Sequence, residues 1–447
     1  MKNTQIYYAR MDEFWRKEEK LTYLEKIEHI GNVEWQEIKP DKNHIWLTVG
    51  LEDDFETFIA LGSQETKSAK GNVSDCLFKI YSRGVVTSRD VWAYNFKFDE
   101  VSVNIEKIIN NYNAQVIKWT QKKDNSVKVD DFVSYDDTQI NWSRDLKLDL
   151  QRGKLADFSP AKIRTSLYRP FTCLFLFFDR ILNEEVYVFP SIFPNSETEA
   201  ENLVICFNGI GSEKPFTSTI SDKIVNLSFI GGGTAYQCFP FYTYDEDGTN
   251  RKENITDWAL EQYRTHYQDS TITKWDIFHY TYSLLHHPDY RERYAANLKR
   301  ELPRIPFAPQ FQPFVTAGKR LAEIHINYEQ QPEYRLKHIE NKDLPIDWQV
   351  EKMRLSKDKT EIKYNDFLTL TGIPTEVFEY RLGNRSALDW IIDQYQVSTD
   401  KRSGITNDPN RLDDEEYIVR LIKQVITVSL ETVKIVKNLP DLGLPKD

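Results

Sequence analysis

The sequence predicts an α+β protein in which a mixed β-sheet lobe is followed by a mainly helical lobe. The chain has 447 residues, and because a single hydrophobic core usually stops growing at about 250–300 residues, two or three domains are expected. Between Trp35 and Tyr244, short apolar runs bounded by glycine and proline are typical of strands. From Ile255 onward, apolar residues recur mostly at helical spacing. We therefore expect a helical segment at residues 1–32, an α/β lobe at 33–250 and a helical lobe at 251–447.

The first segment, Tyr7–Ile30, is charged and carries apolar residues near helical spacing, which predicts an amphipathic helix ended by Gly31-Asn32. The apolar residues are Met11, Phe14, Trp15, Leu21, Leu24 and Ile27. The pattern begins without a capping or entry region. We therefore expect this helix to follow another part of a longer protein and its apolar stripe to be partly exposed.

The α/β lobe is predicted from short apolar runs that alternate with turns. The expected strands are Ile45–Val49, Cys76–Tyr81, Val91–Phe96, Cys173–Phe178, Val186–Phe189, Leu203–Phe207, Ile224–Phe229 and Gln237–Tyr242. One helix is expected over Val101–Trp119, and its inward face would hold Val103, Ile108, Ile109, Tyr112 and Val116. The triple glycine at Gly231 predicts a turn between strands that a nucleic-acid backbone could approach closely.

The second half is predicted to be helical with one hairpin. The expected helices are Ile255–His266, Lys274–His286, Pro288–Glu301, Val315–Tyr328, Ser386–Tyr395 and Asp413–Lys437. The hairpin pairs Val350–Leu355 with Thr360–Tyr364 around a turn of charged residues.

Composition narrows the class of protein. Hydrophobic residues make up 40% and charged residues 28% of the chain, which excludes wholesale disorder. The formal net charge is −11, whereas a free-standing duplex binder is usually basic, so strong independent affinity for DNA is not expected. A local basic face remains compatible with this balance, because salt confines surface fields to roughly 10 Å.

The cysteines and the hydropathy pattern indicate a soluble cytoplasmic protein. The four cysteines are far apart and form no CxxC or Cys/His cluster, so we expect buried reduced thiols and no structural zinc. The N-terminus lacks the apolar core of a signal peptide. The longest apolar stretch, around Leu174–Phe178, is too short to cross a bilayer.

Motifs for catalysis are missing from the sequence. It contains no polar-Pro-Pro-aromatic loop for an amino-group methyltransferase, no phosphate loop and no Gly-x-Ser-x-Gly. Glu361-Ile362-Lys363 matches half of a nuclease motif but follows a tight turn, which favours a solvated hairpin. His286-His287 ends a predicted helix, where histidine complements the helix dipole rather than binding a metal. We predict no catalytic residue, metal or cofactor in this chain.

Several strings in the second half resemble the C-terminal portion of type ISP restriction-modification enzymes, single polypeptides that join nuclease, translocase, adenine methyltransferase and recognition domains. They are Tyr282–Tyr294 (YSLLHHPDYRERY), Leu302–Pro306 (LPRIP), Gly383–Trp390 (GNRSALDW), Asp393–Val397 (DQYQV), Lys401–Ile405 (KRSGI) and Asp408–Arg411 (DPNR). Upstream, Tyr8–Lys17 (YARMDEFWRK) is similar to the point where the family's methyltransferase passes into recognition. The resemblance implies a target-recognition, or specificity, region.

The same resemblance implies partners and cofactors. Double-stranded DNA and the methyltransferase and helicase–nuclease modules would be the partners, and S-adenosylmethionine, ATP and Mg would belong to those modules. Because their motifs are missing, the chain is either a fragment of a longer enzyme or a separate recognition subunit. Two other interpretations stay open: a fragment of a DNA adenine-N6 methyltransferase, and an acidic protein-interaction module that never binds DNA.

The segment from Asn141 to Arg180 has the highest local excess of basic residues, with eight Lys or Arg and four Asp. Its segment Lys162–Pro170 is the leading candidate for DNA contact, as a loop presented by a rigid sheet. The residues expected to contact DNA from this stretch are Arg144, Lys162, Arg164, Tyr168 and Arg169. The alternative is a solvated strand edge with snorkelling side chains.

Three further groups are candidates for DNA contact. The turn Thr87–Asp90 supplies Ser88 and Arg89, unless Arg89 and Asp90 only pair with each other to hold the turn. Strand ends supply side chains that can reach base edges, namely Asn208, Thr234 and Gln237. A polar loop of the helical lobe supplies Lys401, Arg402 and Arg411 for phosphates, with packing against the recognition lobe as the alternative.

Overall fold

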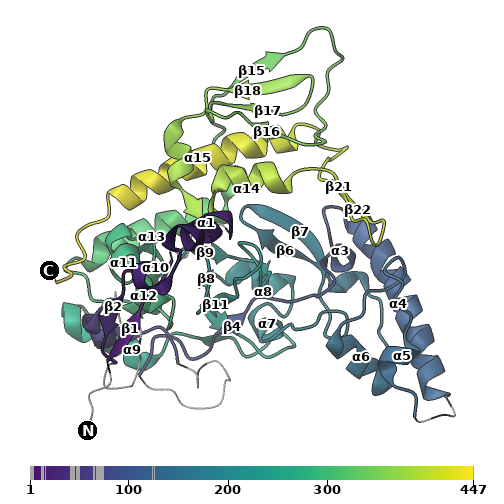
Figure 1. The fold of residues 1–447 in the computed structure, drawn as a ribbon, viewed down its shortest axis with the longest axis horizontal. Helices are drawn as coiled ribbons and strands as arrows, with labels where there is room; N and C mark the ends of the chain where they lie inside the picture. The colour runs from purple at the N-terminus through teal and green to yellow at the C-terminus, as the bar shows by residue number, and fades with distance from the viewer. Residues whose placement is uncertain are drawn as a thin grey trace.

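The computed structural model describes residues 5–11, 15, 17–40, 46, 51–63, 66, 75–122, 124 and 126–445. Helices and several small sheets alternate along this part of the chain, which confirms the predicted α+β class. Figure 1 shows a triangular outline, with β15–β18 at the apex and the helices α9–α12 and α4–α6 at the two lower corners. The predicted strand Ile45–Val49 lies, apart from Trp46, outside the described residues.

Two four-stranded sheets form the centre of the molecule. The first has the order β10-β6-β7-β5, in which β6 and β7 are antiparallel and β10 is parallel to β6. The second has the order β4-β11-β8-β9 and is antiparallel throughout. The strands are β10 (Ile224–Val225), β6 (Ile163–Arg169), β7 (Thr172–Phe177), β5 (Tyr94–Asn95), β4 (Ser82–Arg83), β11 (Tyr236–Pro240), β8 (Val204–Asn208) and β9 (Ser218–Ser221). Every residue of β8, β9 and β11 is buried, so these strands are covered on both faces.

Some predicted strands are wrong. Cys76–Tyr81 makes only an isolated bridge, from Phe78 to Ile255. Val91–Phe96 divides into the short helix α3 (Asp90–Ala93) and β5, and Val186–Phe189 leads into the helix α7 (Phe189–Ile192), which has Pro190 in its first turn. A short apolar run is compatible with any buried conformation, so its length alone does not specify a strand.

The segment Lys162–Pro170, predicted as a loop with a solvated strand edge as the alternative, is mostly the strand β6. Its first residues are the short helix η3 (Pro160–Lys162), and β6 then pairs with β7 along its length. This strand does not lie at the edge, because it pairs with both β10 and β7. Ile163, Ser166 and Leu167 are buried, whereas the residues between them are half-buried. The interleaved polar residues conceal this pattern in the sequence.

The α4 corner has its own hydrophobic core. The predicted helix Val101–Trp119 is confirmed as α4 (Phe98–Thr120), and it packs against α3 and α6 (Arg144–Gln151), beside the short α5 (Val129–Phe132). Its buried face carries Val101, Asn104, Ile105, Ile108, Ile109, Tyr112 and Val116. Val103, which was predicted on this face, is 62% exposed, because it lies about 200° around the helix from Val101.

The helices of the second half are confirmed, with one break. The expected helix Pro288–Glu301 is interrupted at Tyr294. These helices are α9 (Asp257–Tyr267), α10 (Lys274–Leu284), α11 (Pro288–Arg293), α12 (Ala295–Leu298), α13 (Phe311–Ile326), α14 (Ala387–Gln394) and α15 (Tyr417–Lys437), with the short η4 (Tyr328–Gln330) and η5 (Thr375–Glu379). The first half also contains the short helices α8 (Ser196–Glu201) and η2 (Asp53–Thr57). Helices α10 and α13 pack closely, because a Cβ on Gly318 would lie 1.9 Å from the carbonyl oxygen of His279.

The predicted hairpin is part of a four-stranded antiparallel sheet at the apex, with the order β15-β18-β17-β16. Its strands are β15 (Lys337–Glu340), β18 (Leu368–Thr371), β17 (Glu361–Lys363) and β16 (Arg354–Leu355). Glu361 and Lys363 are both exposed on β17, as expected of a solvated hairpin. Short antiparallel pairs elsewhere are β14 (Arg304–Ile305) with β3 (Ile59–Ala60), β12 (Tyr242–Thr243) with β13 (Lys252–Glu253), β19 (Arg381–Leu382) with β20 (Arg385–Ser386), and β21 (Ser398–Thr399) with β22 (Thr406–Asn407).

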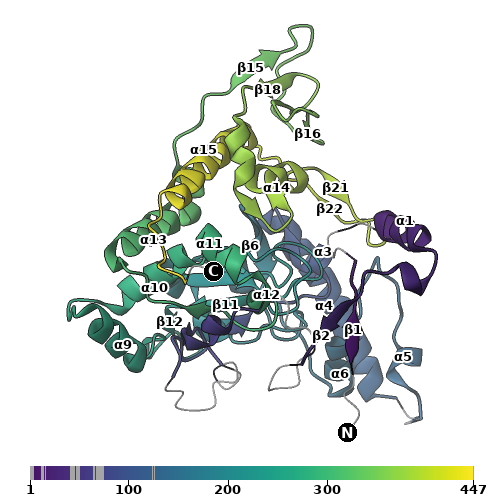
Figure 2. The same ribbon diagram turned by 60° about the vertical axis from the view of Figure 1, so that its left-hand side comes forward.

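The N-terminal arm, residues 5–40 in their described part, differs from the long helix predicted over Tyr7–Ile30. Strand β1 (Ile6–Tyr8) pairs with β2 (Gln36–Ile38), and only α1 (Lys17–Ile27) and η1 (Ile30–Asn32) are helical. Figure 2 shows α1 at the edge of the molecule. The expected exposure of its apolar stripe is confirmed, since α1 has no buried residue and Leu21 and Leu24 are 49% and 51% exposed. Phe14 lies outside the described residues.

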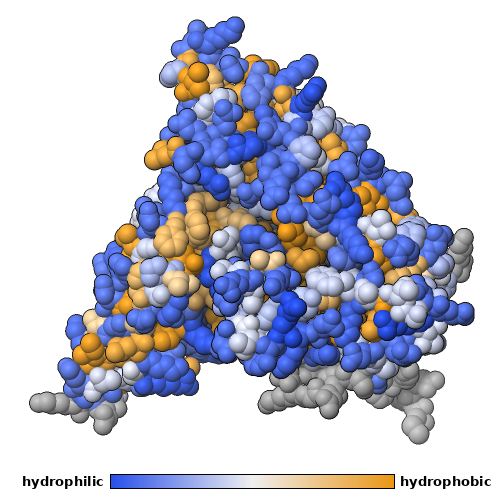
Figure 3. Space-filling view, turned by 180° about the vertical axis from the view of Figure 1, so that it is seen from behind, coloured by the Kyte–Doolittle hydropathy of each residue, from blue (hydrophilic) through white to orange (hydrophobic). Residues whose placement is uncertain are grey.

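Two of the hydrophobic cores combine residues from both sides of position 250. One joins the first sheet to α14, α15 and the apex sheet, and the other joins the second sheet to α10 and α13. The domain boundary predicted between residues 250 and 251 stays a prediction, because each of these cores contains residues from both sides of it. From behind, the molecule is hollowed near its centre, and hydrophobic residues lie around the hollow (Figure 3). Among the described residues, no helix has both the length and the apolar character that membrane crossing requires.

The contact at Gly318 provides a test of the α10–α13 packing. We expect Gly318→Ala to lower the free energy of unfolding by about 1–3 kcal/mol, because the added methyl group forces the two helix backbones apart. Denaturant unfolding followed by circular dichroism measures this. Gly232→Ala is the matched control, since no atom lies within 4 Å of a Cβ there. Equal unfolding free energies for the two variants would show that the helices do not pack this closely.

Candidate nucleic-acid interface

Three cations from distant parts of the sequence meet at one cleft. Arg169 ends β6, Lys214 lies in the loop between β8 and β9, and Arg385 begins β20. Together with the Gly231-Gly232 turn they line a cleft of about 430 Å³, which we call the cationic cleft. Its other lining residues are Ile230, Asn384, Trp390, Asp393 and Gln394.

Each cation is positioned by its neighbours. The Arg169 guanidinium lies 3.8 Å from the centre of the Tyr168 ring and donates to Asn226 Oδ1 at 3.1 Å. Lys214 Nζ donates to the carbonyl oxygen of Ile230. The Arg385 guanidinium lies 5.0 Å from the centre of the Trp390 ring and pairs with Asp393 at 2.6 Å. Their directions are therefore fixed before any ligand arrives.

The positive charge of the cleft is incompletely neutralised. Among the described residues, neither Arg169 nor Lys214 has a carboxylate within ion-pair distance, and Asp393 is taken by Arg385. Burial and the positive charges of Arg385 and Arg169 lower the pKa of Lys214, while Glu213 acts in the opposite direction. A phosphate oxygen placed here would relieve the mutual repulsion of the cations.

The glycine turn leaves room for a close approach. Gly231 and Gly233 have φ values of +94° and +77°, which favour glycine, and Gly232 has no neighbour within 4 Å of a Cβ position. Thr234 Oγ1 holds the turn by donating to the carbonyl oxygen of Gly231 at 2.8 Å. The main chain is therefore open at Gly232, whereas Lys214 Nζ lies 2.7 Å from a Cβ position on Gly231 and the Glu213 carboxylate lies 3.5 Å from one on Gly233.

A second cleft, also of about 430 Å³, continues from the first and shares Asp393 and Gln394 with it. It lies between the first sheet and the hairpin β21–β22 and is lined mostly by polar groups. These are Asp90, Tyr94, Tyr168, Thr172, Gln394, Gln396, Ser398, Thr399, Asp400 and Asn407. Amides and hydroxyls of this kind form the directional hydrogen bonds that distinguish base edges. We call it the polar cleft.

Most of the basic side chains in the cationic stretch between Asn141 and Arg180 are neutralised within the protein. Seven of the eight side chains pair with carboxylates; they are Arg144, Lys147, Arg152, Lys154, Lys162, Arg164 and Arg180. Arg144 is 77% exposed beside Asp145, and Lys162 pairs with Asp179 at 2.9 Å. Within this stretch, Arg169 alone has no carboxylate partner among the described residues.

Two predicted DNA contacts serve instead as internal braces. Arg89 is 3% exposed and donates to the carbonyl oxygens of Asn141 and Leu182 and to Ser143 Oγ. Burial lowers its pKa to about 10. Arg164 pairs with Glu199 and donates to the carbonyl oxygens of Phe193 and Pro194. Both placements differ from the predicted role at DNA, because these charges are already satisfied inside the protein.

The three strand-end candidates are also buried. Asn208 is 4% exposed and clamps the loop that carries Lys214: its Nδ2 donates to the carbonyl oxygens of Lys214 and Pro215, each at 3.1 Å. Thr234 holds the glycine turn, as described above. Gln237 is 6% exposed, and its Oε1 has no hydrogen-bond partner among the described residues. Asn208 and Thr234 therefore act by positioning the cleft rather than by lining a surface.

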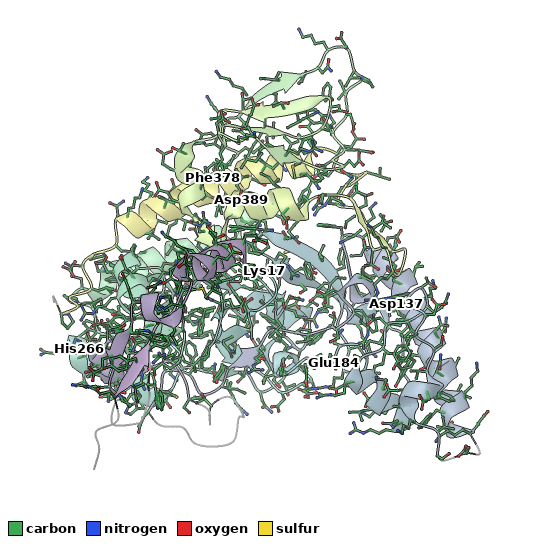
Figure 4. All side chains as sticks on the ribbon, in the orientation of Figure 1. Lys17, Asp137, Glu184, His266, Phe378 and Asp389 are labelled. Carbon is green, nitrogen blue, oxygen red and sulfur yellow. The ribbon has the colours of Figure 1, made fainter. Side chains whose placement is uncertain are left out.

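Of the remaining candidates, Tyr168 lines the polar cleft, whereas Ser88, Lys401, Arg402 and Arg411 line neither cleft. Tyr168 donates to Asp90 Oδ2 at 3.0 Å, and burial followed by Asp90 raises its pKa. Ser88, Lys401 and Arg411 are exposed. Arg402 is 73% exposed and pairs at 2.6 Å with Asp137, which Figure 4 labels beside the α4 corner. This ion pair ties the loop between β21 and β22 to that corner.

Sequence reasoning did not select Lys214, Arg385, Gln394 and Gln396. Two signals pointed toward them. The glycine turn at Gly231 was interpreted as open to a nucleic-acid backbone, and both Arg385 and Gln394 lie in strings that carry the family resemblance. Their convergence depends on the tertiary packing of segments far apart in the sequence.

Comparisons with known proteins agree on one family. The family model described as the type ISP C-terminal specificity domain matches residues 76–422. No curated protein matches the sequence. Among solved structures, a nuclease-deletion mutant of the type ISP restriction-modification enzyme LlaGI in complex with a DNA substrate mimic is 34% identical, with a TM-score of 0.85, over 100% of this chain and 40% of that one.

Two further structures are similar. The DrdV–DNA complex is 34% identical, with a TM-score of 0.84, over 99% of this chain and 44% of that one. The ATP-dependent type ISP restriction-modification enzyme LlaBIII bound to DNA is 29% identical, with a TM-score of 0.81, over 96% and 27%. The chain thus spans less than half the length of each. It belongs to the type ISP C-terminal specificity domain family.

Proposed function

We propose that this chain recognises a specific sequence of double-stranded DNA and positions it for adenine methylation and restriction by other modules. The observation that carries the proposal is the continuity of the cationic cleft with the polar cleft through Asp393 and Gln394. Phosphate contacts set the register of a duplex, and directional polar groups beside them read bases. The similar structures of LlaGI with a DNA substrate mimic and of DrdV and LlaBIII with DNA support it.

In this proposal, Arg169, Lys214 and Arg385 bind phosphates, and the Gly231-Gly232-Gly233 turn allows the DNA backbone to approach. Gln394 and Gln396 are candidates for base reading, because a carboxamide makes two hydrogen bonds to adenine in the major groove. The exposed Ser88, Arg144, Lys401 and Arg402 would add contacts at the rim. Lys162 and Tyr168, which are held by Asp179 and Asp90, would support the surface from below.

The acidic body is compatible with this role. The net charge of −11 weakens long-range attraction to DNA, so affinity depends on the local cluster and on neighbouring modules. We propose that methyltransferase and helicase–nuclease modules are those partners, and that S-adenosylmethionine, ATP and Mg act there. The exposed apolar face of the N-terminal arm, with Leu21, Leu24 and Ile30, is the proposed contact with the methyltransferase module.

The cationic cleft is tested by single substitutions. We expect Lys214→Ala and Arg169→Ala each to weaken retention of duplex DNA by about 1–3 kcal/mol and to reduce the salt dependence of binding by about one counterion. Fluorescence anisotropy over a series of salt concentrations measures both. Arg180→Ala is the control, because Arg180 comes from the same cationic stretch but pairs with Glu246 at 2.6 Å.

If Lys214→Ala and Arg169→Ala both bind DNA as the parent protein does, the cleft is not the phosphate site. Retention on a basic protein partner with no retention on DNA at low salt would favour the alternative of an acidic interaction module.

The polar cleft is tested by sequence preference. We expect selection from a randomised duplex pool, followed by sequencing, to yield one motif for the parent protein. Gln394→Ala is expected to relax one position of that motif, because a base contact distinguishes one base from another. Lys214→Ala is expected to lower the recovery of DNA without changing the motif, because a phosphate contact carries no sequence information. An unchanged motif for Gln394→Ala and for Gln396→Ala would remove the polar cleft from base reading.

The N-terminal arm is tested by charge on its apolar face. We expect Leu24→Glu to reduce co-purification with a separately expressed methyltransferase module by about tenfold or more, because a buried unpaired carboxylate opposes association. DNA binding by the chain alone is expected to stay unchanged. Thr22→Glu adds the same charge to the opposite face of α1 and serves as the control. Equal loss for both variants would show that charge rather than the apolar face controls the association.

A further inference from the structure

A third cavity, of about 620 Å³, lies where the loop between β8 and β9 meets α11, α12, η5 and the last turns of α15. It touches the cationic cleft only through Lys214, and the proposed DNA contacts do not use its interior. We call it the arginine pocket. Its size falls in the range of sites that enclose small organic ligands, about 300–1,000 Å³.

The pocket contains a cation without a counter-charge. Arg291, on α11, donates from Nε to the carbonyl oxygen of Leu285 at 2.6 Å and from Nη2 to Ser218 Oγ at 3.1 Å. Both acceptors are neutral, and among the described residues no carboxylate pairs with Arg291. Burial lowers its pKa to about 10, so the guanidinium stays charged at neutral pH. Arg291 is half-buried, and a charge that is partly withdrawn from water without a counter-charge favours the binding of an anion.

Two buried polar atoms of the pocket are also unsatisfied. Tyr380 and His286 both line the pocket and are 6% and 2% exposed, yet Tyr380 Oη and His286 Nε2 have no hydrogen-bond partner among the described residues. His286 Nδ1 lies 2.8 Å from the carbonyl oxygen of Tyr282, which assigns the proton to Nδ1 and leaves Nε2 as an acceptor. Burial and Arg291 lower the pKa of His286, so the ring is neutral.

The unused groups form a complementary set. The guanidinium and Tyr380 Oη offer donors and His286 Nε2 offers an acceptor. Each buried polar atom is unfavourable while it remains unpaired. Much of the lining is apolar, and Phe216 lies with its ring centre 6.0 Å from the Arg291 guanidinium. Charged residues also line the pocket, namely Glu292, Lys299, Arg381 and the ion pair of Glu379 with Lys437. Other apolar lining residues are Pro215, Pro288, Ala295, Leu298, Val433 and Val436.

We propose that the arginine pocket binds a small organic anion, with its carboxylate or phosphate on Arg291 and Tyr380 and its apolar body against Phe216 and Val433. A donor group on the ligand would satisfy His286 Nε2. This site is separate from DNA recognition and does not depend on it.

The probe for the test is anilinonaphthalene sulfonate, an aromatic anion whose fluorescence rises in apolar sites. Titration of the whole chain is expected to give saturable binding at one site. Arg291→Met is expected to weaken this binding by about tenfold or more, because a charge-assisted contact is lost. The uncharged dye phenylnaphthylamine is expected to bind both proteins alike. Arg144→Met, at an exposed arginine outside the pocket, is the matched control.

Because Arg291 also holds Leu285 and Ser218, a second variant separates binding from folding. Tyr380→Phe removes a hydroxyl that has no hydrogen-bond partner among the described residues, so the melting temperature is expected to stay unchanged or to rise while dye affinity falls several-fold. Displacement of the dye by adenosine monophosphate but not by adenosine would identify a phosphate as the anion, and displacement by benzoate alone would identify a carboxylate. Absence of saturable binding, or equal affinity of the parent, Arg291→Met and Tyr380→Phe proteins, would overturn the proposal.

Discussion

The packing of α14 and α15 against the β6–β7 sheet is the constraint on which the candidate interface depends. One hydrophobic core runs from Leu174 and Val225 of the first sheet to Leu388 and Ile422 of the two helices. This core brings β20 beside the end of β6, so that Arg385 faces Arg169 across a narrow cleft. Apolar burial thus holds these positive charges close together although they repel each other. An incoming anion would relieve this repulsion.

Polar side chains inside the protein hold the segments that line the two clefts in place. Asn208 fixes the loop of Lys214, Thr234 fixes the glycine turn, and Arg89 joins the turn before α3 to α6. Hairpin β21–β22 is held to the opposite wall of the polar cleft by Asn95 Nδ2, which donates to the carbonyl oxygen of Thr406, and by the ion pair of Lys97 with Asp408. These hydrogen bonds and the ion pair hold the walls of the clefts in position before DNA binds, which reduces the entropy lost on binding.

The sequence predicts this fold well where periodicity is long and poorly where it is short. Helices α4, α10, α13 and α15 each continue an apolar stripe for several turns, and all were predicted close to their observed bounds. Strand β6 was predicted as a loop, with a strand edge as the alternative, because polar residues interrupt its inward face. The run Val186–Phe189 was predicted as a strand because four apolar residues fit several conformations. The general class of site was predictable from the family resemblance.

The identity of the cleft residues was not predictable, because charge in a sequence does not reveal whether a carboxylate from elsewhere will neutralise it. Seven of the eight basic side chains between Asn141 and Arg180 have such partners, whereas Arg169 has none in the part of the chain that the structure describes. The cationic cleft and the arginine pocket share Lys214, and Thr217 Oγ1 accepts from the Gly383 amide at 2.9 Å to hold the β19–β20 hairpin beside the pocket. Arg385 belongs only to the cleft and Arg291 only to the pocket. A change in ligand binding caused by substitution of Arg291 but not of Arg385 therefore comes from the pocket. A change caused by substitution of Lys214 alone comes from the wall that the pocket and the cleft share.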